Sequence, residues 1–429
     1  GFSPYILPIP AVIIIAAIFL SPRVAFLLSS LILTILTVGM QYDSQFLIIF
    51  TILSLIGMIT VSKIRYTRRF DLIKVGFNLS VAGLLIMLSL YFIDKCLIDV
   101  SNALILRNCI FIFVNGLFSS IVALGVSPLL ESTFHIITPY GLAELGDHNQ
   151  PLLKRLQIEA PGTYHHSLMV STLCEAAAEA IGANPILARV GAFYHDIGKL
   201  KRPLFFVENQ SYFSIENPHN SLNPRLSKMV ITAHPKDGVE LAKEYGLPSI
   251  INDFILQHHG EGLAKYFYNQ AVQEEGIENV KEEQFRYTGP KPNSKETAIL
   301  MLADAVESAV RAMKGATTEE IENIIDKIIV ERLNDGQLAD SPLTLKDIKI
   351  IAATFSRILR GMQHNRIKYQ ENIAEEFAKN KIEIPHKALD EDLEKKIKAL
   401  EDSKKPKAET KTEDNNKTDL NKENNKKDL

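Results

Sequence analysis

Cysteine is scarce in this chain of 429 residues, which contains only Cys96, Cys109 and Cys174. Their positions fit neither a metal site nor a disulfide framework, so we interpret all three as packing residues. The sequence also lacks a basic segment ahead of its first apolar stretch, which argues against a signal peptide. Because it begins with Gly rather than Met, we expect a fragment whose natural N-terminal part has been removed.

A strong positive charge is also missing. The formal net charge is −3, and residues 1–130 carry eight basic and four acidic side chains, so this part is +4 and the remainder is −7. Proteins that bind nucleic acid polymers usually carry a clear basic excess. We therefore expect no nucleic acid polymer as a partner.

Long hydrophobic runs are confined to the first part of the chain. Overall, 46% of the residues are hydrophobic and 23% are charged. None of the long runs has a central ionisable residue that would mark an ion or proton path, which argues against a transporter. Each run is long enough to cross ~30 Å of hydrocarbon, so the expected partner is a lipid bilayer. The five predicted spans are Phe2–Leu20, Val24–Met40, Phe46–Ser62, Val75–Ile93 and Cys109–Leu130.

The charges between the spans predict their orientation, because cytoplasmic loops are enriched in Lys and Arg. The connection at 63–74 is the most basic and is expected in the cytoplasm, whereas the connection at 41–45 has no positive charge and is expected outside. An odd number of spans then places Gly1 outside and everything after Leu130 in the cytoplasm.

The rest of the chain has helical periodicity and almost no alternating strand pattern. The predicted fold class is therefore all-α, with a multi-span helical membrane domain at 1–130, a juxtamembrane connector at 131–160 and an all-helical cytoplasmic domain at 161–398. A tail at 399–429 is rich in Lys, Glu, Asp and Asn and is expected to be disordered.

An ordered set of histidines and aspartates in the helical domain indicates a metal site. Asp304 stands alone in the apolar stretch Ala298–Val306, where a buried carboxylate is costly unless it is paired or bound to metal. His165 is ambiguous because it adjoins His166. The histidines interpreted as surface or hydrogen-bonded residues are His135, His148, His219, His364 and His386. The predicted metal ligands are His166, His195, Asp196, His234, His258, His259 and Asp304.

Imidazole and carboxylate ligands together favour Fe, Mn or Zn. Two such ions activate a bridging hydroxide and neutralise the oxygens of a phosphoryl group during in-line displacement. Asp196, with two oxygens, is the expected bridge between the ions. Lys199 either places an ammonium on the phosphate, as a second catalytic residue, or is an exposed lysine at a helix end.

Eight stretches of the helical domain carry a recognisable pattern of residues. They are Gly162–Leu168, Tyr194–Lys199, Lys201–Gln210, Asn217–Asn220, Gln257–Gly260, Lys265–Tyr268, Gly289–Pro292 and Leu302–Ser308. In these stretches the sequence resembles the bacterial seven-transmembrane HD-domain proteins that hydrolyse cyclic di-AMP, members of the HD phosphohydrolase superfamily. The similarity covers roughly residues 131–315.

The resemblance implies a membrane-bound phosphodiesterase that cleaves cyclic di-AMP to linear pApA. It implies two divalent ions, of which Mn²⁺ or Fe²⁺ are favoured. It also implies a multi-pass protein of the bacterial plasma membrane. It implies that one ion is held by His166, His195, Asp196 and Asp304 and the other by Asp196, His234, His258 and His259. The five spans agree with a truncated seven-span region, which in such relatives follows an extracellular domain. Glu261 and Gly262 depart from the small hydroxyl residues that relatives often carry there.

Two alternatives remain open. A phosphohydrolase acting on cyclic di-GMP or another nucleotide is disfavoured because the Gly-Tyr-Pro tripeptide typical of HD-GYP domains is absent from the sequence. A receptor that binds a nucleotide without turning it over is disfavoured because every ligand position is filled. Assembly into a homo-oligomer, the signal sensed by the membrane part and the residues that recognise the bases are left undecided.

Overall fold

The computed structural model describes residues 3–63, 69–97, 101–134, 136–313 and 316–380. The described residues form helices joined by turns and contain no β-strand; the single isolated bridge pairs Leu263 with Arg286. The all-helical prediction is therefore confirmed. The predicted disordered tail, 399–429, lies outside the described residues.

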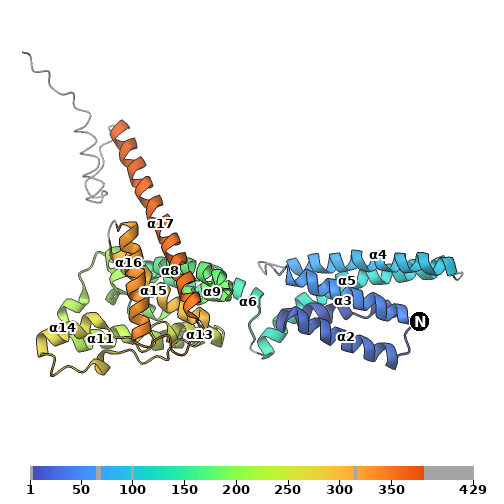
Figure 1. Ribbon diagram of the computed structural model, residues 1–429, viewed down its shortest axis with the longest axis horizontal. Coiled ribbons are helices and arrows are strands. Elements are labelled where there is room, and N and C mark those ends of the chain that lie inside the picture. Colours follow the sequence, from blue (N-terminus) through green and yellow to red (C-terminus); the bar gives the residue numbers. More distant parts are fainter. Residues whose placement is uncertain (1–2, 64–68, 98–100, 135, 314–315, 381–429) are drawn as a thin grey trace, which may run out of the picture. The chain divides into compact units, whose positions relative to one another are not determined.

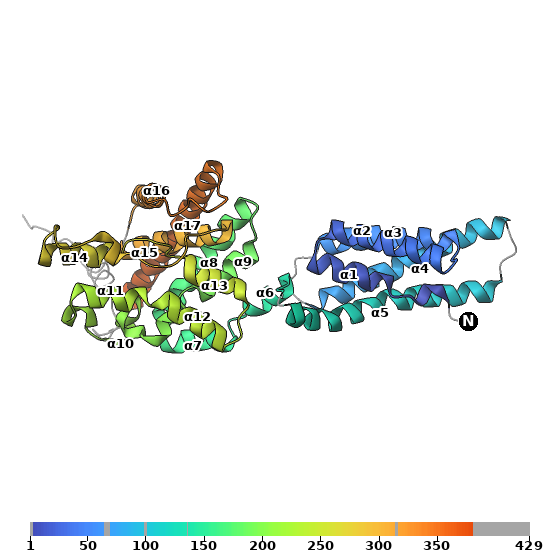
Figure 2. The same ribbon diagram turned by 90° about the horizontal axis from the view of Figure 1, so that it is seen from below.

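The N-terminal part is a bundle of long apolar helices (Figures 1 and 2). Helices α4 and α5 run side by side along most of their length, and α1 packs against α2, α3 and α5. The elements of this part are η1 (Pro4–Ile6), α1 (Ile9–Phe19), α2 (Pro22–Gly39), α3 (Ser44–Ser62), α4 (Asp71–Leu97) and α5 (Asn102–Phe134).

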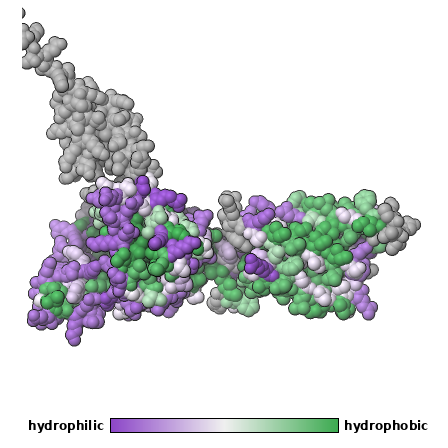
Figure 3. Space-filling view, in the orientation of Figure 1, coloured by the Kyte–Doolittle hydropathy of each residue, from purple (hydrophilic) through white to green (hydrophobic). Residues whose placement is uncertain are grey.

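Four of these helices, α2 to α5, are long and apolar enough to cross a membrane. Large apolar side chains of α2 such as Leu27, Ile35 and Val38 are more than half exposed, which suits a surface that faces lipid rather than water. In the space-filling view, hydrophobic residues cover most of the visible face of this part (Figure 3). The chain is therefore a membrane protein.

The first predicted span, Phe2–Leu20, is not one continuous helix. Pro8 precedes α1, and the short 3-10 turn η1 ends before it, so α1 has only 11 residues. Proline lacks the backbone N–H that a continuous helix would need at this position. The apolar segment Pro4–Phe19 is therefore too short to count among the candidate membrane spans, and a fifth span remains a prediction.

The C-terminal part carries the predicted ligands on short helices around a central one, α15. Helix α15 packs against α8, α9, α13 and α16. The elements of the C-terminal part are α6 (Pro139–Leu145), α7 (Pro151–Glu159), α8 (Pro161–Ala180), α9 (Pro185–Tyr194), η2 (Ile197–Lys201), η3 (Pro203–Phe205), α10 (Val207–Phe213), η4 (Pro218–Ser221), α11 (Pro224–Thr232), α12 (His234–Glu244), α13 (Ser249–Gln257), α14 (Lys265–Glu275), η5 (Glu282–Phe285), α15 (Lys295–Ala312), α16 (Thr318–Asn334) and α17 (Leu345–Asn380).

Two helices of the predicted connector contribute to the core of this domain. Leu142 of α6 and Leu152, Leu153 and Leu156 of α7 are buried in one cluster with Tyr194, next to the predicted ligands. The Tyr194 hydroxyl also donates a hydrogen bond to the carbonyl of Leu145. The boundary at residue 161 remains a prediction, but α6 and α7 pack as part of the helical domain.

The chain divides into two compact units, residues 1–358 and 359–429. Helix α17 begins in the first unit and continues into the second, of which only residues up to Asn380 are described. The predicted ligands all lie in the first unit.

Candidate metal centre

Local structure brings the His195–Asp196 pair to the end of a helix. Helix α9 starts at Pro185, where the Asn184 side chain accepts a hydrogen bond from the Leu187 N–H, and it ends at Tyr194. His195 and Asp196 follow immediately, and the chain then tightens into the 3-10 turn η2. Both side chains are almost completely buried, with 0% and 1% of the residue exposed. The pair therefore faces the interior of the domain.

A glycine allows the next ligand segment to come close. A Cβ on Gly198, in η2, would lie 1.9 Å from the carbonyl oxygen of His234 and 2.6 Å from the amide nitrogen of Gly238. Only glycine fits at such a close approach of two backbones. Gly198 thus permits η2 to pack on α12, which positions His234 beside Asp196.

The Asp196 carboxylate lies between two groups of imidazoles. Its Oδ2 is 3.1 Å from Nε2 of His195 and 3.6 Å from Nε2 of His166. Its Oδ1 is 3.3 Å from Nε2 of His234 and 3.6 Å from Nε2 of His258. Each oxygen therefore faces a different pair of histidines, which is the arrangement that a bridging ligand requires.

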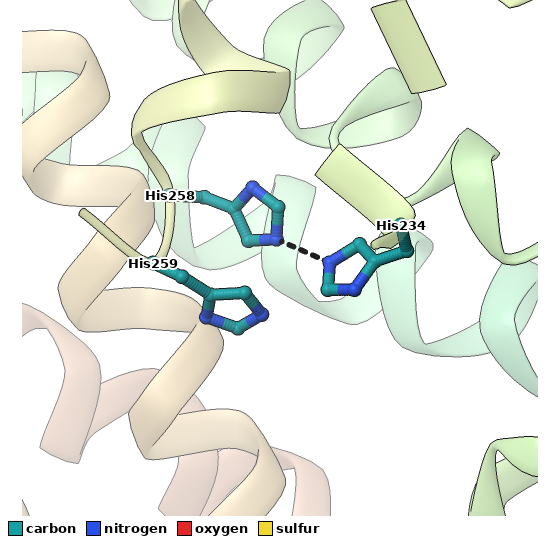
Figure 4. A group of neighbouring side chains, drawn as sticks. All are labelled: His234, His258 and His259. Carbon is teal, nitrogen blue, oxygen red and sulfur yellow. Dashed lines mark hydrogen bonds between the residues drawn. The ribbon is translucent and has the colours of Figure 1, made fainter. Parts of the chain in front are cut away.

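The remaining predicted ligands complete the two groups. Asp304 Oδ1 is 3.0 Å from Nε2 of His166, and Asp304 Oδ2 is 3.7 Å from Nδ1 of His259. Figure 4 shows His234, His258 and His259 lying around a common centre. Three groups each offer ligand atoms within 4.8 Å of one another: His234, His258 and His259; His166, His195 and Asp304; His195, Asp196 and His258. All seven predicted ligands come together, although their assignment to particular ions remains a prediction.

Hydrogen bonds fix which ring nitrogen of each histidine points inward. The Nδ1 atoms of His195, His234 and His258 lie 2.7, 2.6 and 2.8 Å from the carbonyl oxygens of residues three positions earlier. A carbonyl oxygen can only accept, so each Nδ1 carries the proton and each Nε2 presents its lone pair to the centre. The three rings are therefore prepared to bind a cation through Nε2.

The donor set fits metal ions better than it fits an interior without them. Nε2 of His234 lies only 3.1 Å from Nε2 of His258, so two lone pairs face each other. Nε2 of His195 and Oδ1 of Asp196 have no hydrogen-bond partner of regular geometry among the described residues, whereas Oδ2 of Asp196 is paired with the ammonium of Lys199. Buried polar atoms without partners are costly, and divalent cations would satisfy them.

Electrostatics keep His234, His259 and Asp196 in the forms that metals bind. Burial lowers the pKa of His234 to about 3 and holds the pKa of His259 well below its usual range, so both rings are neutral. Although burial would raise the pKa of Asp196, its interactions with the neighbouring His195 ring and with the Lys199 ammonium hold it well below its usual range. The neutral rings of His234 and His259 and the ionised Asp196 are the forms that bind metals. His166 differs, because the carboxylates of Asp304 and Glu307 outweigh burial and raise its pKa to about 9, so this ring must release a proton when it binds a metal.

Lys199 is buried rather than exposed at a helix end. Its Nζ is 2.7 Å from Asp196 Oδ2 and 2.7 Å from Glu208 Oε1, and its side chain is 12% exposed. Burial would lower the pKa of Lys199, but these two carboxylates raise it, so the ammonium stays charged. A positive charge thus lies beside the Asp196 carboxylate; the catalytic role of Lys199 remains a prediction.

Sequence reasoning missed three residues that contact the predicted ligands or Lys199. Glu307, one turn after Asp304 on α15, is 2.5 Å from Nδ1 of His166 and is 5% exposed. Glu208 holds Lys199, and the ring of Tyr287 lies 4.3 Å from the ring of His259. The spacing of Glu307 from Asp304 on an apolar helix was a usable signal, whereas Tyr287 lies in a loop with no such pattern.

Glu307→Ala is expected to weaken metal binding by about 10- to 100-fold. A carboxylate that accepts a hydrogen bond from the Nδ1–H of a ligating histidine orients its ring and increases its basicity. Glu307→Gln keeps an acceptor and should lose less. Competition with a fluorescent chelator measures the affinity, and Glu319→Ala, on the exposed start of α16, is the control. Equal affinity in the Ala variant and the unchanged chain would show that Glu307 does not position His166.

Two family models match the chain. The model described as a 7TM receptor with an intracellular HD hydrolase matches residues 1–138, and the HD domain model matches residues 163–309. The first match covers the bundle of apolar helices, and the second covers all seven predicted ligands.

Named relatives agree with these matches. The cyclic-di-AMP phosphodiesterase PgpH of Bacillus subtilis (strain 168) is 40% identical over 377 residues, which cover 86% of this chain and 51% of that protein. PgpH of Listeria monocytogenes (serotype 1/2a, strain 10403S) is 44% identical over 326 residues, covering 76% and 44%. The chain thus spans about half the length of these relatives.

A solved structure also matches the helical domain. The crystal structure of the L. monocytogenes PgpH HD domain in complex with cyclic-di-AMP has 50% sequence identity, covers 50% of this chain and 99% of that chain, and has a TM-score of 0.48. The resemblance predicted from the sequence motifs is confirmed by the family models and the named relatives. The chain belongs to the family of seven-transmembrane receptors with an intracellular HD hydrolase.

Proposed function

We propose that this chain is a membrane-bound, metal-dependent phosphodiesterase that hydrolyses cyclic di-AMP to linear pApA. The observation that carries the proposal is the Asp196 carboxylate, whose two oxygens each face a separate pair of imidazole Nε2 atoms. The names of the relatives, both cyclic-di-AMP phosphodiesterases, supply the substrate class.

In this proposal His166, His195, Asp196 and Asp304 hold one ion, while Asp196, His234, His258 and His259 hold the second. Two transition-metal ions, Mn²⁺ or Fe²⁺, would supply an activated water as nucleophile and would neutralise charge on the phosphodiester. Imidazole-rich sites favour such ions over Mg²⁺, which prefers oxygen ligands.

The chain's own residues then have distinct roles. The Asp196 carboxylate lies between the two groups of histidines. The hydrogen bonds of Nδ1 keep the Nε2 atoms of His195, His234 and His258 directed toward it. Lys199, held charged between Asp196 and Glu208, would stabilise negative charge on a phosphodiester oxygen as a point charge. Because Glu208 accepts from the same ammonium, it is expected to set where that charge lies.

The proposal includes the orientation of the chain. The connection at 63–74 is the most basic one between the apolar helices, which favours a cytoplasmic location for it. Helices α4 and α5 follow this connection, and if each crosses the membrane once, the HD domain after α5 lies on the same, cytoplasmic side. Cyclic dinucleotides are intracellular anions, so an HD domain in the cytoplasm would meet its substrate directly.

The proposed activity is tested with the purified full chain in lipid nanodiscs and Mn²⁺. We expect cyclic di-AMP to disappear with the formation of one product of the mass of pApA, and cyclic di-GMP to react at least about tenfold more slowly. Chromatography with mass detection measures both substrates. Faster turnover of cyclic di-GMP would favour the alternative specificity, and tight binding without product would favour a receptor.

A further inference from the structure

His259 differs from the other predicted histidine ligands in how its ring is held. Each of the other four has Nδ1 within 2.8 Å of a carboxylate or carbonyl oxygen. In the part of the chain that the structure describes, no residue hydrogen-bonds to the ring of His259, and its Nδ1 is 3.7 Å from Asp304 Oδ2, too far for a hydrogen bond. The main chain around His259 and the packing of its ring must therefore set its position.

The main chain directly after His259 lies against a buried amide. Gly260 has a φ of +51°, in the left-handed region that favours glycine. A Cβ at Gly260 would lie 2.5 Å from Oε1 of Gln337 and 2.9 Å from Cε of Met301. Gln337 comes from the segment that follows α16 and is only 1% exposed. Glycine thus lets the ligand segment and this side chain come into direct contact.

The main chain of the next residue, Glu261, is held on both sides. Its N–H donates to Gln337 Oε1 at 2.9 Å, and its carbonyl oxygen accepts from Arg286 Nη1 at 2.9 Å. Both partners also bind the carboxylate of Asp335. Gln337 Nε2 donates to its Oδ2 at 2.8 Å, and Arg286 donates to Oδ2 at 3.1 Å and to Oδ1 at 2.8 Å. The four residues thus form a closed ring of hydrogen bonds.

The same network continues into the packing of the His259 ring. Arg286 is followed by Tyr287, whose ring lies 4.3 Å from that of His259. The Tyr287 N–H donates to the carbonyl of Gly262 at 2.9 Å, which ties the two segments together again. Polar networks whose members are satisfied make their surroundings rigid. The main chain and the ring of His259 are therefore both held by residues that are not predicted ligands.

We infer that Gln337, together with Arg286 and Asp335, positions His259 as a metal ligand by fixing the main chain at Glu261. Ligating histidines are usually oriented by a hydrogen bond to the second ring nitrogen, and this network takes the place of that bond for His259. Gln337 acts through the main chain, so it is a positioning residue and not a catalytic one. The inference rests on the proposed metal centre for the role of His259.

Gln337→Met tests the inference, because Met keeps the length of the side chain but lacks both the acceptor for Glu261 and the donor to Asp335. The metal-free full chain in nanodiscs is titrated with Co²⁺, which binds such ligands at least as tightly as Mn²⁺ or Fe²⁺. Visible absorption reports the amount of bound Co²⁺ and the arrangement of its ligands. We expect one Co²⁺ ion to bind about tenfold more weakly, with a changed absorption band, because partners that orient a ligand contribute in this range.

Gln273→Met is the matched control, because Gln273 is exposed on α14, and this variant should bind Co²⁺ like the unchanged chain. A thermal melt of each variant shows whether the fold is kept. If Gln337→Met does not fold, Arg286→Met provides the same test. It removes the other contact to the Glu261 main chain, and the Arg286 side chain is more exposed, at 27%.

A double-mutant cycle separates the positioning of His259 from a general effect on the structure. In a chain that already carries His259→Ala, Gln337→Met should change Co²⁺ binding by less than about twofold, because the residue on which it acts is gone. Beside Glu307→Ala, which acts on His166, it should keep its full effect of about tenfold.

Weaker Co²⁺ binding that disappears beside His259→Ala supports the inference. It does so even if cyclic di-AMP is not hydrolysed, in which case only the proposed function fails. Unchanged Co²⁺ binding and absorption in Gln337→Met, or an equal loss with and without His259, would overturn the inference.

Discussion

Asp196→Asn is expected to lower the rate of cyclic di-AMP hydrolysis by about three orders of magnitude or more. When several residues act as one catalytic unit, removing any one of them costs most of the rate enhancement. Asn has nearly the same shape but only one oxygen and no charge. It therefore cannot face both pairs of imidazoles as the carboxylate does, with Oδ2 3.1 Å from His195 and Oδ1 3.3 Å from His234.

The fold should survive this change, because Lys199 retains its partner Glu208 at 2.7 Å. Turnover and metal content of the full chain are measured together with a thermal melt. Asp340→Asn, on an exposed turn, is the control and should behave like the unchanged chain. If Asp196→Asn kept more than about a tenth of the activity, Asp196 would not be the bridging ligand.

Chelation is expected to reduce activity to background and to lower the melting temperature, since ions that bind only the folded chain stabilise it. Mn²⁺ or Fe²⁺ should restore both properties. Mg²⁺ should restore little, because the centre offers five imidazoles and Mg²⁺ prefers oxygen ligands. A chelated chain that hydrolyses cyclic di-AMP at the original rate, or that responds to Mg²⁺ as well as to Mn²⁺, would rule out this centre as the catalytic site.

Residues that come together at the candidate metal centre could be predicted from the sequence where they stand out locally. Asp304 is a carboxylate in an apolar helix, and His195 and Asp196 adjoin at a helix end, so their chemistry is visible without coordinates. The division of the Asp196 oxygens between two pairs of histidines could not be predicted from spacing. It depends on how closely η2 and α12 pack, which Gly198 permits.

How the predicted connector packs could not be read from its sequence. Leu152 and Leu156 of α7 belong to the same core as Tyr194, although the stretch before residue 161 looked like a connector. An amphipathic helix of nine residues carries the same pattern whether it packs on its own domain or links two others. The environment of Lys199 was undecided for a similar reason, since its partner Glu208 comes from a separate helix.

The most direct test of the central claim is a metal titration of the metal-free full chain in nanodiscs, with cyclic di-AMP turnover followed at each addition of Mn²⁺. Because Asp196 lies between two groups of ligands, turnover should stay near background up to the first equivalent and rise as the second is bound. Full turnover at one equivalent of Mn²⁺ per chain would contradict a two-ion centre bridged by Asp196.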